Sequence, residues 1–134
     1  MTEIIRHARE VGLDFLCPTD HGTLAARTLA GWHEGLLLIP GMEVNDLGHH
    51  VLAFGIEREV PANETCPQAV VDGVRAQGGT CFAAHPHDRT CRLMPGFRGC
   101  PWTDWSVSGY SGIEIWNYMS TWKGEANDFA SALK

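Results

Sequence analysis

Residues 36–45 of the chain read Leu36-Leu37-Leu38-Ile39-Pro40-Gly41-Met42-Glu43-Val44-Asn45. Four consecutive apolar residues are typical of a strand that is covered on both faces, and the change to Pro40-Gly41 marks the end of that strand. The same pattern occurs earlier, where the apolar run 13–17 leads into Pro18-Thr19-Asp20-His21. Both strands are therefore expected to deliver polar side chains at their carboxyl ends.

Helical and extended patterns alternate along the rest of the chain. Apolar spacing predicts helices over residues 2–12, 23–33 and 67–77 and over roughly the last ten residues. Strands are expected over residues 50–56, 80–84 and 112–116, the first of them hairpinned to the strand before it because few residues separate the two. Residues 87–111 have the composition of a long loop. This order indicates an α/β fold with a mostly parallel sheet and one hairpin.

Composition narrows the classes of protein that the chain can represent. The chain has 134 residues, a net charge of −6 and 44% hydrophobic residues, which is typical of one globular domain. It has neither a run of about 20 apolar residues nor the order of a signal peptide, so a membrane protein is not expected. Without clustered Lys and Arg, nucleic acid is disfavoured as a partner. Five cysteines without a C-x-x-C pair favour reduced thiols and a cytoplasmic location.

Side chains that bind metals follow several of the predicted strands. His21, Glu43, His85 and Asn117 each come at the end of an apolar run, and His50 begins the predicted hairpin strand. Carboxyl ends of parallel strands meet at one edge of a sheet, so these side chains are expected to lie close together. Imidazole and carboxylate groups are ligands for Zn, Mn or Fe, and a carboxylate can bridge two ions. The sequence therefore predicts a divalent metal site.

These segments resemble the motifs of the polymerase and histidinol phosphatase (PHP) domains, which are metal-dependent phosphoesterases. Residues 12–21 (GLDFLCPTDH) are similar to the family's "GLD...TDH" element, and residues 40–44 (PGMEV) resemble its "PG.E" element. Residues 50–55 (HVLAFG), 84–86 (AHP) and 113–117 (IEIWN) resemble its "HvLgyg", "AHP" and "iEv.N" segments. The resemblance implies an incomplete, distorted (βα)7 TIM-like barrel, with mostly parallel strands and one hairpin, formed by residues 1–134 as a single partial domain.

The resemblance also implies roles for individual residues. His21 would bind one metal ion, Glu43 would bridge two ions, and His50 and His85 would bind another, with His21, Glu43 and His85 forming the catalytic set. His49 competes with His50, since neighbouring residues on a strand point to opposite faces; we favour His50. Asp20 is expected to orient a ligand or a helix start. Arg89 is expected at the substrate, and Asn117 is expected either at the substrate or in a structural hydrogen bond.

The expected activity is hydrolysis of a small phosphorylated substrate by metal-activated water, with up to three ions in a complete domain. Arg89, Arg92 and Arg98 are candidates to bind phosphate, although solvated loop charges explain them too. Trp102, Trp105 and Trp116 either stack on an aromatic leaving group or pack within the loop.

Two other functions stay open: a carbamate or ester hydrolase of the same fold, and a non-catalytic metal-binding module. In the sequence given, no H-x-H element precedes residues 12–21, where the family has its first one, and no D-x-H element follows residues 113–117. The chain therefore looks like the middle portion of a longer domain, and by itself it is expected to be inactive or impaired. The sequence does not indicate an oligomeric state.

Overall fold

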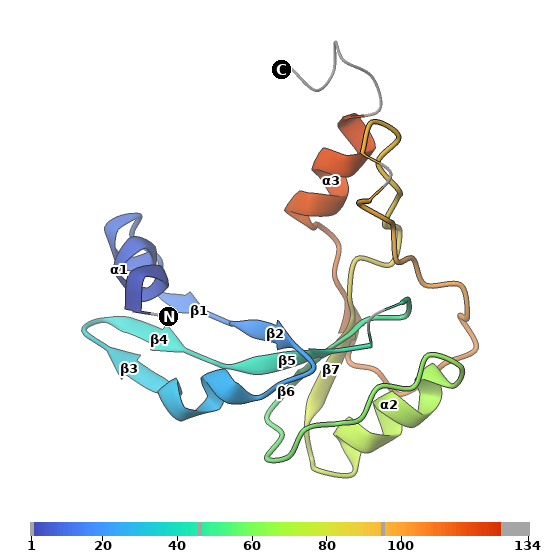
Figure 1. Cartoon of the computed structure of the whole chain (residues 1–134). Helices are drawn as coiled ribbons and strands as arrows, with labels where there is room; N and C mark the ends of the chain where they lie inside the picture. The colour runs from blue at the N-terminus through green and yellow to red at the C-terminus, as the bar shows by residue number, and fades with distance from the viewer. Residues whose placement is uncertain (1, 46, 95, 127–134) are drawn as a thin grey trace.

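The computed structural model describes residues 2–45, 47–94 and 96–126 (Figure 1). Within these residues the chain forms three helices, α1 (Thr2–Glu10), α2 (Pro67–Arg75) and α3 (Tyr118–Glu125), and one 3-10 segment, Ala25–Leu29. The eight strands are β1 (Phe15–Leu16), β2 (Thr19–His21), β3 (Gly31–His33), β4 (Leu36–Leu38), β5 (Gly41–Val44), β6 (Val51–Phe54), β7 (Thr80–Ala83) and β8 (Gly112–Ile113). They form a three-stranded sheet, β1-β4-β3, and a five-stranded sheet, β2-β5-β6-β7-β8.

The two sheets are linked by two chain segments that run side by side. β1 pairs with β4 in parallel, and further along the same segments β2 pairs with β5 in parallel. The changeover comes at Pro18 and Pro40, which have no N–H to donate to the ladder. Contact continues across it, because the Gly41 N–H donates to the Pro18 carbonyl over 2.8 Å. A Cβ at Gly41 would collide with the Ala53 carbonyl of the neighbouring strand, so only glycine fits this close approach.

The expected TIM-like barrel of mostly parallel strands is wrong. Both sheets are mixed: β3–β4, β5–β6 and β6–β7 are antiparallel, whereas β1–β4, β2–β5 and β7–β8 are parallel. The link between β5 and β6 is too short for a parallel crossover, which requires a dozen or more residues. The hairpin expected there is confirmed, with Val44 opposite Val51. Its return strand, β6, then lies between β5 and β7 and runs against both of them.

The helix expected over residues 23–33 is also wrong. Only the 3-10 segment forms there, and the end of the range is strand β3, hairpinned to β4 with His33 opposite Leu36. The two linking residues, Glu34 and Gly35, have φ values of 49° and 95°. Positive φ at both positions is the geometry of a type I′ turn, which matches the twist of a hairpin.

The helices expected over residues 2–12 and 67–77 are confirmed as α1 and α2. The helix expected over the last ten residues falls largely on residues 127–134, which lie outside the described part of the chain; α3 precedes them. The described helices have eight or nine residues each, and none is long and apolar enough to cross a membrane.

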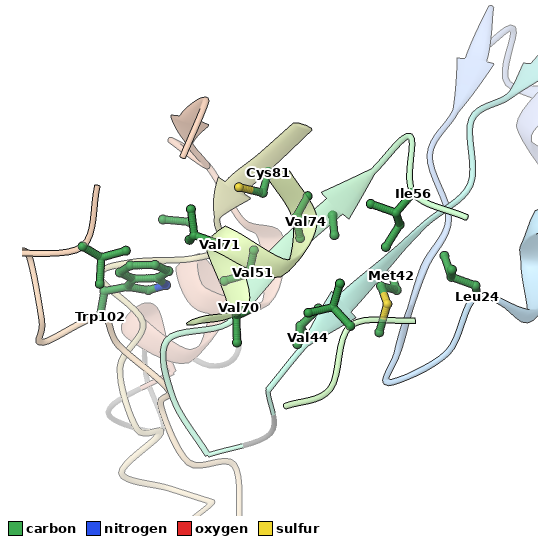
Figure 2. Packing of buried hydrophobic residues seen from close by; sticks show 14 residues of the cluster. Leu24, Met42, Val44, Val51, Ile56, Val70, Val71, Val74, Cys81 and Trp102 are labelled. Atoms are coloured by element: carbon green, nitrogen blue, oxygen red, sulfur yellow. The ribbon is translucent and has the colours of Figure 1, made fainter. Parts of the chain in front are cut away.

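The main core lies between α2 and one face of the five-stranded sheet (Figure 2). Val70, Val71 and Val74 of α2 are fully buried against strand residues that include Met42, Val44, Val51 and Cys81. Successive side chains of a strand point to opposite faces. Since Met42 and Val44 face this core, Glu43 between them points to the other face of the sheet.

Candidate metal centre

Three histidines and one glutamate converge at one edge of the five-stranded sheet. His21 ends β2 and is the register partner of Glu43 in β5. His50 directly precedes β6, and its carbonyl accepts the Ala84 N–H over 3.0 Å, which brings His85 to the same edge. Because β6 is antiparallel to its neighbours, its start lies beside the ends of β5 and β7. The structure brings these four residues together, and their role as metal ligands stays a prediction.

Glu43 is the centre of the cluster. Its Oε1 lies 2.7 Å from His50 Nδ1 and 3.0 Å from His85 Nε2, and its Oε2 lies 3.5 Å from His21 Nε2. The rings of His21 and His50 are 5.3 Å apart and those of His50 and His85 are 4.8 Å apart, measured between centroids. The side chains of Glu43, His50 and His85 are 14%, 7% and 13% exposed, whereas His21 is 56% exposed. Three of the four side chains are thus largely buried, and the cluster is accessible to solvent at His21.

This environment keeps Glu43 ionised. Burial by itself would raise the pKa of Glu43, but hydrogen bonds from His50 and His85 and the nearby charges of His21 and His50 lower it to about 2. Burial alone would lower the pKa of His85, yet its hydrogen bond to Glu43 and the charges of Glu43, Asp88 and Glu114 raise it. At neutral pH the cluster therefore presents a carboxylate, the form that binds a cation.

The donor set fits a divalent ion. Ligand atoms of His21, Glu43 and His50 all lie within 4.8 Å of one another. Ligands about 2.0–2.2 Å from a shared ion are separated by roughly 3–4 Å, so the spacing of this set is close to that of metal ligands. His85 lies outside that set of three, although it contacts Glu43 directly. His50 Nε2 and His85 Nδ1, the ring nitrogens that do not contact Glu43, are buried and have no hydrogen-bond partner among the described residues.

His85 is held in an unusual backbone conformation, with φ at 27°. A non-glycine residue at positive φ is strained and persists only where its surroundings hold it. Glu114 supplies that restraint, since its Oε2 accepts the His85 N–H over 2.7 Å. Glu114 Oε1 also accepts from the Asn117 side chain over 3.1 Å. Sequence reasoning gave Glu114 no role, although a charged residue within an apolar strand pattern was a usable signal.

Asn117 has a clear structural role. Its side chain caps the start of α3 by accepting the Ser120 N–H over 3.0 Å, and the residue also lines the hollow beside the cluster. Asp20 does not lie at the cluster. It is exposed and its register partner is Met42, which faces the core, so Asp20 is on the opposite face of the sheet from Glu43.

The structure distinguishes His49 from His50. His50 Nδ1 contacts Glu43, whereas His49 Nε2 lies 3.0 Å from the Thr103 hydroxyl and accepts the backbone N–H groups of Thr103 and Asp104. Of these neighbours, only His50 faces the candidate centre. Trp102 is buried, and its Nε1 donates to the His50 carbonyl over 2.9 Å. This tryptophan therefore supports the backbone at His50, and its buried ring is not accessible for stacking on a leaving group.

Two adjoining hollows lie at the cluster. The first, of about 290 Å³, is lined by the four cluster residues together with others that include Asp88, Arg98 and Lys123. The second, of about 350 Å³, shares His85 and Asn117 with the first and is also lined by Arg89 and Trp116. Arg92 lines neither hollow, and the Trp105 side chain is exposed beside the ring of His87.

A buried ion pair beside the cluster was missed by sequence reasoning. Lys123 of α3 donates to Asp88 Oδ2 over 2.5 Å and to the Arg98 carbonyl over 3.4 Å. Asp88 also accepts the backbone N–H groups of Arg89 and Cys100. Burial alone would raise the pKa of Asp88, but its bonds to Lys123, Ser120 and Cys100 lower it.

Comparison with known proteins places the chain in no family. No protein-family model matches it. The chain is similar to the uncharacterized protein MJ1587 of Methanocaldococcus jannaschii, with 21% identity over 94 residues, which is 68% of this chain and 54% of the relative. The chain thus spans about half the length of this curated relative. The resemblance to PHP domains stays a prediction.

Proposed function

We propose that this chain provides a divalent metal centre for hydrolysis of a small phosphate ester, with His21, Glu43, His50 and His85 as ligands. The observation that carries the proposal is the buried carboxylate of Glu43, which contacts ring nitrogens of three histidines, His21, His50 and His85, brought together from separate strands. Zn, Mn and Fe suit such mixed nitrogen and oxygen ligands. The PHP-like order of the motifs supports the same function.

Each residue would make a separate contribution. Glu43 would bring the negative charge that holds cations, and Glu114 would keep His85 in position through its backbone N–H. A bound ion would supply a Lewis acid and activate water at neutral pH. Arg98 at the first hollow and Arg89 at the second would attract anionic groups of the substrate. The free thiols of all five cysteines support the proposal of a cytoplasmic location.

Metal titration followed by an activity assay tests the proposal. Zn²⁺, Mn²⁺ and Fe²⁺ would be titrated into the metal-free chain by calorimetry, and the loaded protein assayed with p-nitrophenyl phosphate, p-nitrophenyl acetate and an aryl carbamate. Phosphate ester hydrolysis that chelator abolishes supports the proposal. Hydrolysis of only the acetate or carbamate would identify the related hydrolase. Metal binding without turnover would identify this chain by itself as a non-catalytic module, and failure to bind any of the three ions would refute the metal centre.

A further inference from the structure

Lys123 is a buried cation at the wall of the candidate centre. The residue is 8% exposed, and it lines the same hollow as Glu43 and His50. Folding brings Lys123 to this position from a distant part of the sequence. It lies on α3, which follows β8, and its partner Asp88 is 35 residues earlier in the chain. The cation thus comes from a segment that supplies none of the proposed metal ligands.

Stability gives no sufficient reason for a lysine at this position. A buried ion pair gains little over a packed apolar pair, because the cost of removing both charges from water offsets their attraction. Ionisable groups that are buried beside a cleft and paired with a specific partner are concentrated at functional sites. The Asp88–Lys123 pair meets both conditions.

The hydrogen bonds of Lys123 leave capacity for a ligand. An ammonium group has three N–H donors. Two of them are directed at Asp88 Oδ2 and the Arg98 carbonyl. The third can donate to an acceptor within the hollow that Lys123 lines.

The charges around the hollow favour a doubly negative ligand. Its lining includes two carboxylates, Glu43 and Asp88, and two fixed cations, Arg98 and Lys123, which cancel. Histidines are neutral when they bind a metal, so one divalent ion would give the hollow a charge of about +2. A phosphoryl dianion balances that charge, whereas a neutral ester or carbamate does not.

We propose that Lys123 binds an anionic oxygen of the phosphoryl group, held for this purpose by Asp88. This inference rests on the proposed function, because the phosphoryl group would lie between the metal centre and the Lys123 Nζ. Asp88 fixes the position of the lysine, and its charge offsets that of the ammonium until substrate enters.

The test compares binding of Mn²⁺ with binding of methylphosphonate, which cannot be hydrolysed and which is a dianion in mildly alkaline buffer. Calorimetry would be carried out on the whole chain and on the variants Lys123→Met, Lys123→Arg and Asp88→Asn/Lys123→Met. The double variant has no unpaired buried carboxylate, so it keeps the test open if Lys123→Met does not fold. It also leaves the net charge of the hollow unchanged, which separates direct contact by Nζ from general attraction. Arg58→Gln, which removes an exposed charge that does not line the hollow, is the control.

The Mn²⁺ titration judges the proposed function, and the methylphosphonate titration of the loaded protein judges the lysine. Loss of one charged hydrogen bond should weaken methylphosphonate binding by about ten- to a hundredfold in both Met variants. Lys123→Arg should restore part of the affinity, and Arg58→Gln should have none of this effect. Mn²⁺ affinity should be retained throughout. The proposal is overturned if either folded Met variant binds methylphosphonate as the original chain does, or if the affinities for Mn²⁺ and methylphosphonate fall together, which is the signature of a merely structural role.

Discussion

Replacing Glu43 by glutamine keeps the size and shape of the side chain but removes its negative charge. In the folded chain Oε1 accepts two hydrogen bonds from imidazole N–H groups, over 2.7 and 3.0 Å. An amide retains one carbonyl acceptor, and its NH₂ group has no acceptor among these N–H donors. The variant therefore tests the charge at the centre of the cluster with little change in packing.

The structure indicates how large the effect should be. The surroundings of Glu43 lower its pKa from 4.5 to about 2, a preference for the carboxylate of about 3 kcal/mol at roughly 1.4 kcal/mol for each tenfold change in acidity. Even residues that only orient a ligand change metal affinity by about 10–100-fold. A charged ligand should matter more, so we expect Glu43→Gln to weaken binding of Zn²⁺ or Mn²⁺ by at least about 100-fold, or about 2.8 kcal/mol.

Titration calorimetry at pH 7 measures this difference directly, and Co²⁺ titration followed by visible absorption gives an independent measurement. The matched control is Glu57→Gln, the same change at a side chain that is 77% exposed and away from the cluster. Circular dichroism checks that both variants fold. If folded Glu43→Gln binds Zn²⁺ as tightly as the Glu57→Gln control, Glu43 is no ligand and the proposed centre is wrong.

Three further predictions follow from the same contacts. His85→Asn should weaken metal binding by about tenfold or more, whereas His49→Asn should change it by no more than about twofold, and equal losses in calorimetry would contradict the assignment. In urea unfolding of the metal-free chain, the stability contributed by Glu43, whose pKa is lowered, should be present above about pH 4.5 and be lost as pH falls toward about 2. The stability contributed by His85, whose pKa is raised, should be present below pH 6.5 and be lost as pH rises above that value. The two contributions together should therefore be greatest between about pH 4.5 and 6.5. Glu43→Gln should make the free energy of unfolding depend less on pH. Trp102→Ala should cost about 3–5 kcal/mol, and Trp102→Phe, which loses only the bond to the His50 carbonyl and part of the ring, about 1–2 kcal/mol; urea midpoints equal to that of the original chain would refute the structural role of this ring.

The candidate site was largely predictable because its residues mark the ends of strands. His21, His50 and His85 each lie at the boundary of an apolar run, and such boundaries can be recognised in a single sequence. The Asp88–Lys123 pair could not be predicted in this way. Its members are 35 residues apart, and Lys123 lies on a helix that contacts Asp88 and Arg98 only in the folded chain.

The error in the fold arose from strand direction, on which hydrophobic periodicity gives no information. The apolar runs predict β4, β6 and β7 correctly. The hydrophobic pattern of a strand is the same, however, whether the neighbouring strand is parallel or antiparallel to it. A helix between two strands suggested a parallel crossover, yet α2 connects the antiparallel strands β6 and β7. Residues 34–35 are Glu-Gly, which is not among the dipeptides typical of a two-residue hairpin, so the helical spacing before them decides the prediction.

The predicted convergence of the site residues survives the loss of the predicted barrel because the two depend on different features. The expected TIM-like barrel requires mostly parallel strands, whereas the cluster requires only that chosen strand ends meet at one edge. Because β6 is antiparallel to β5 and β7, the start of β6 lies at the edge where those two strands end. His50 directly precedes β6, so it lies at this edge and contacts Glu43. His21 and Glu43 come from parallel strands and His50 precedes the antiparallel strand, and both histidines contact the Glu43 carboxylate. The geometry of the candidate centre is therefore a property of one edge of a mixed sheet, and its chemistry can be tested without assuming any closed barrel.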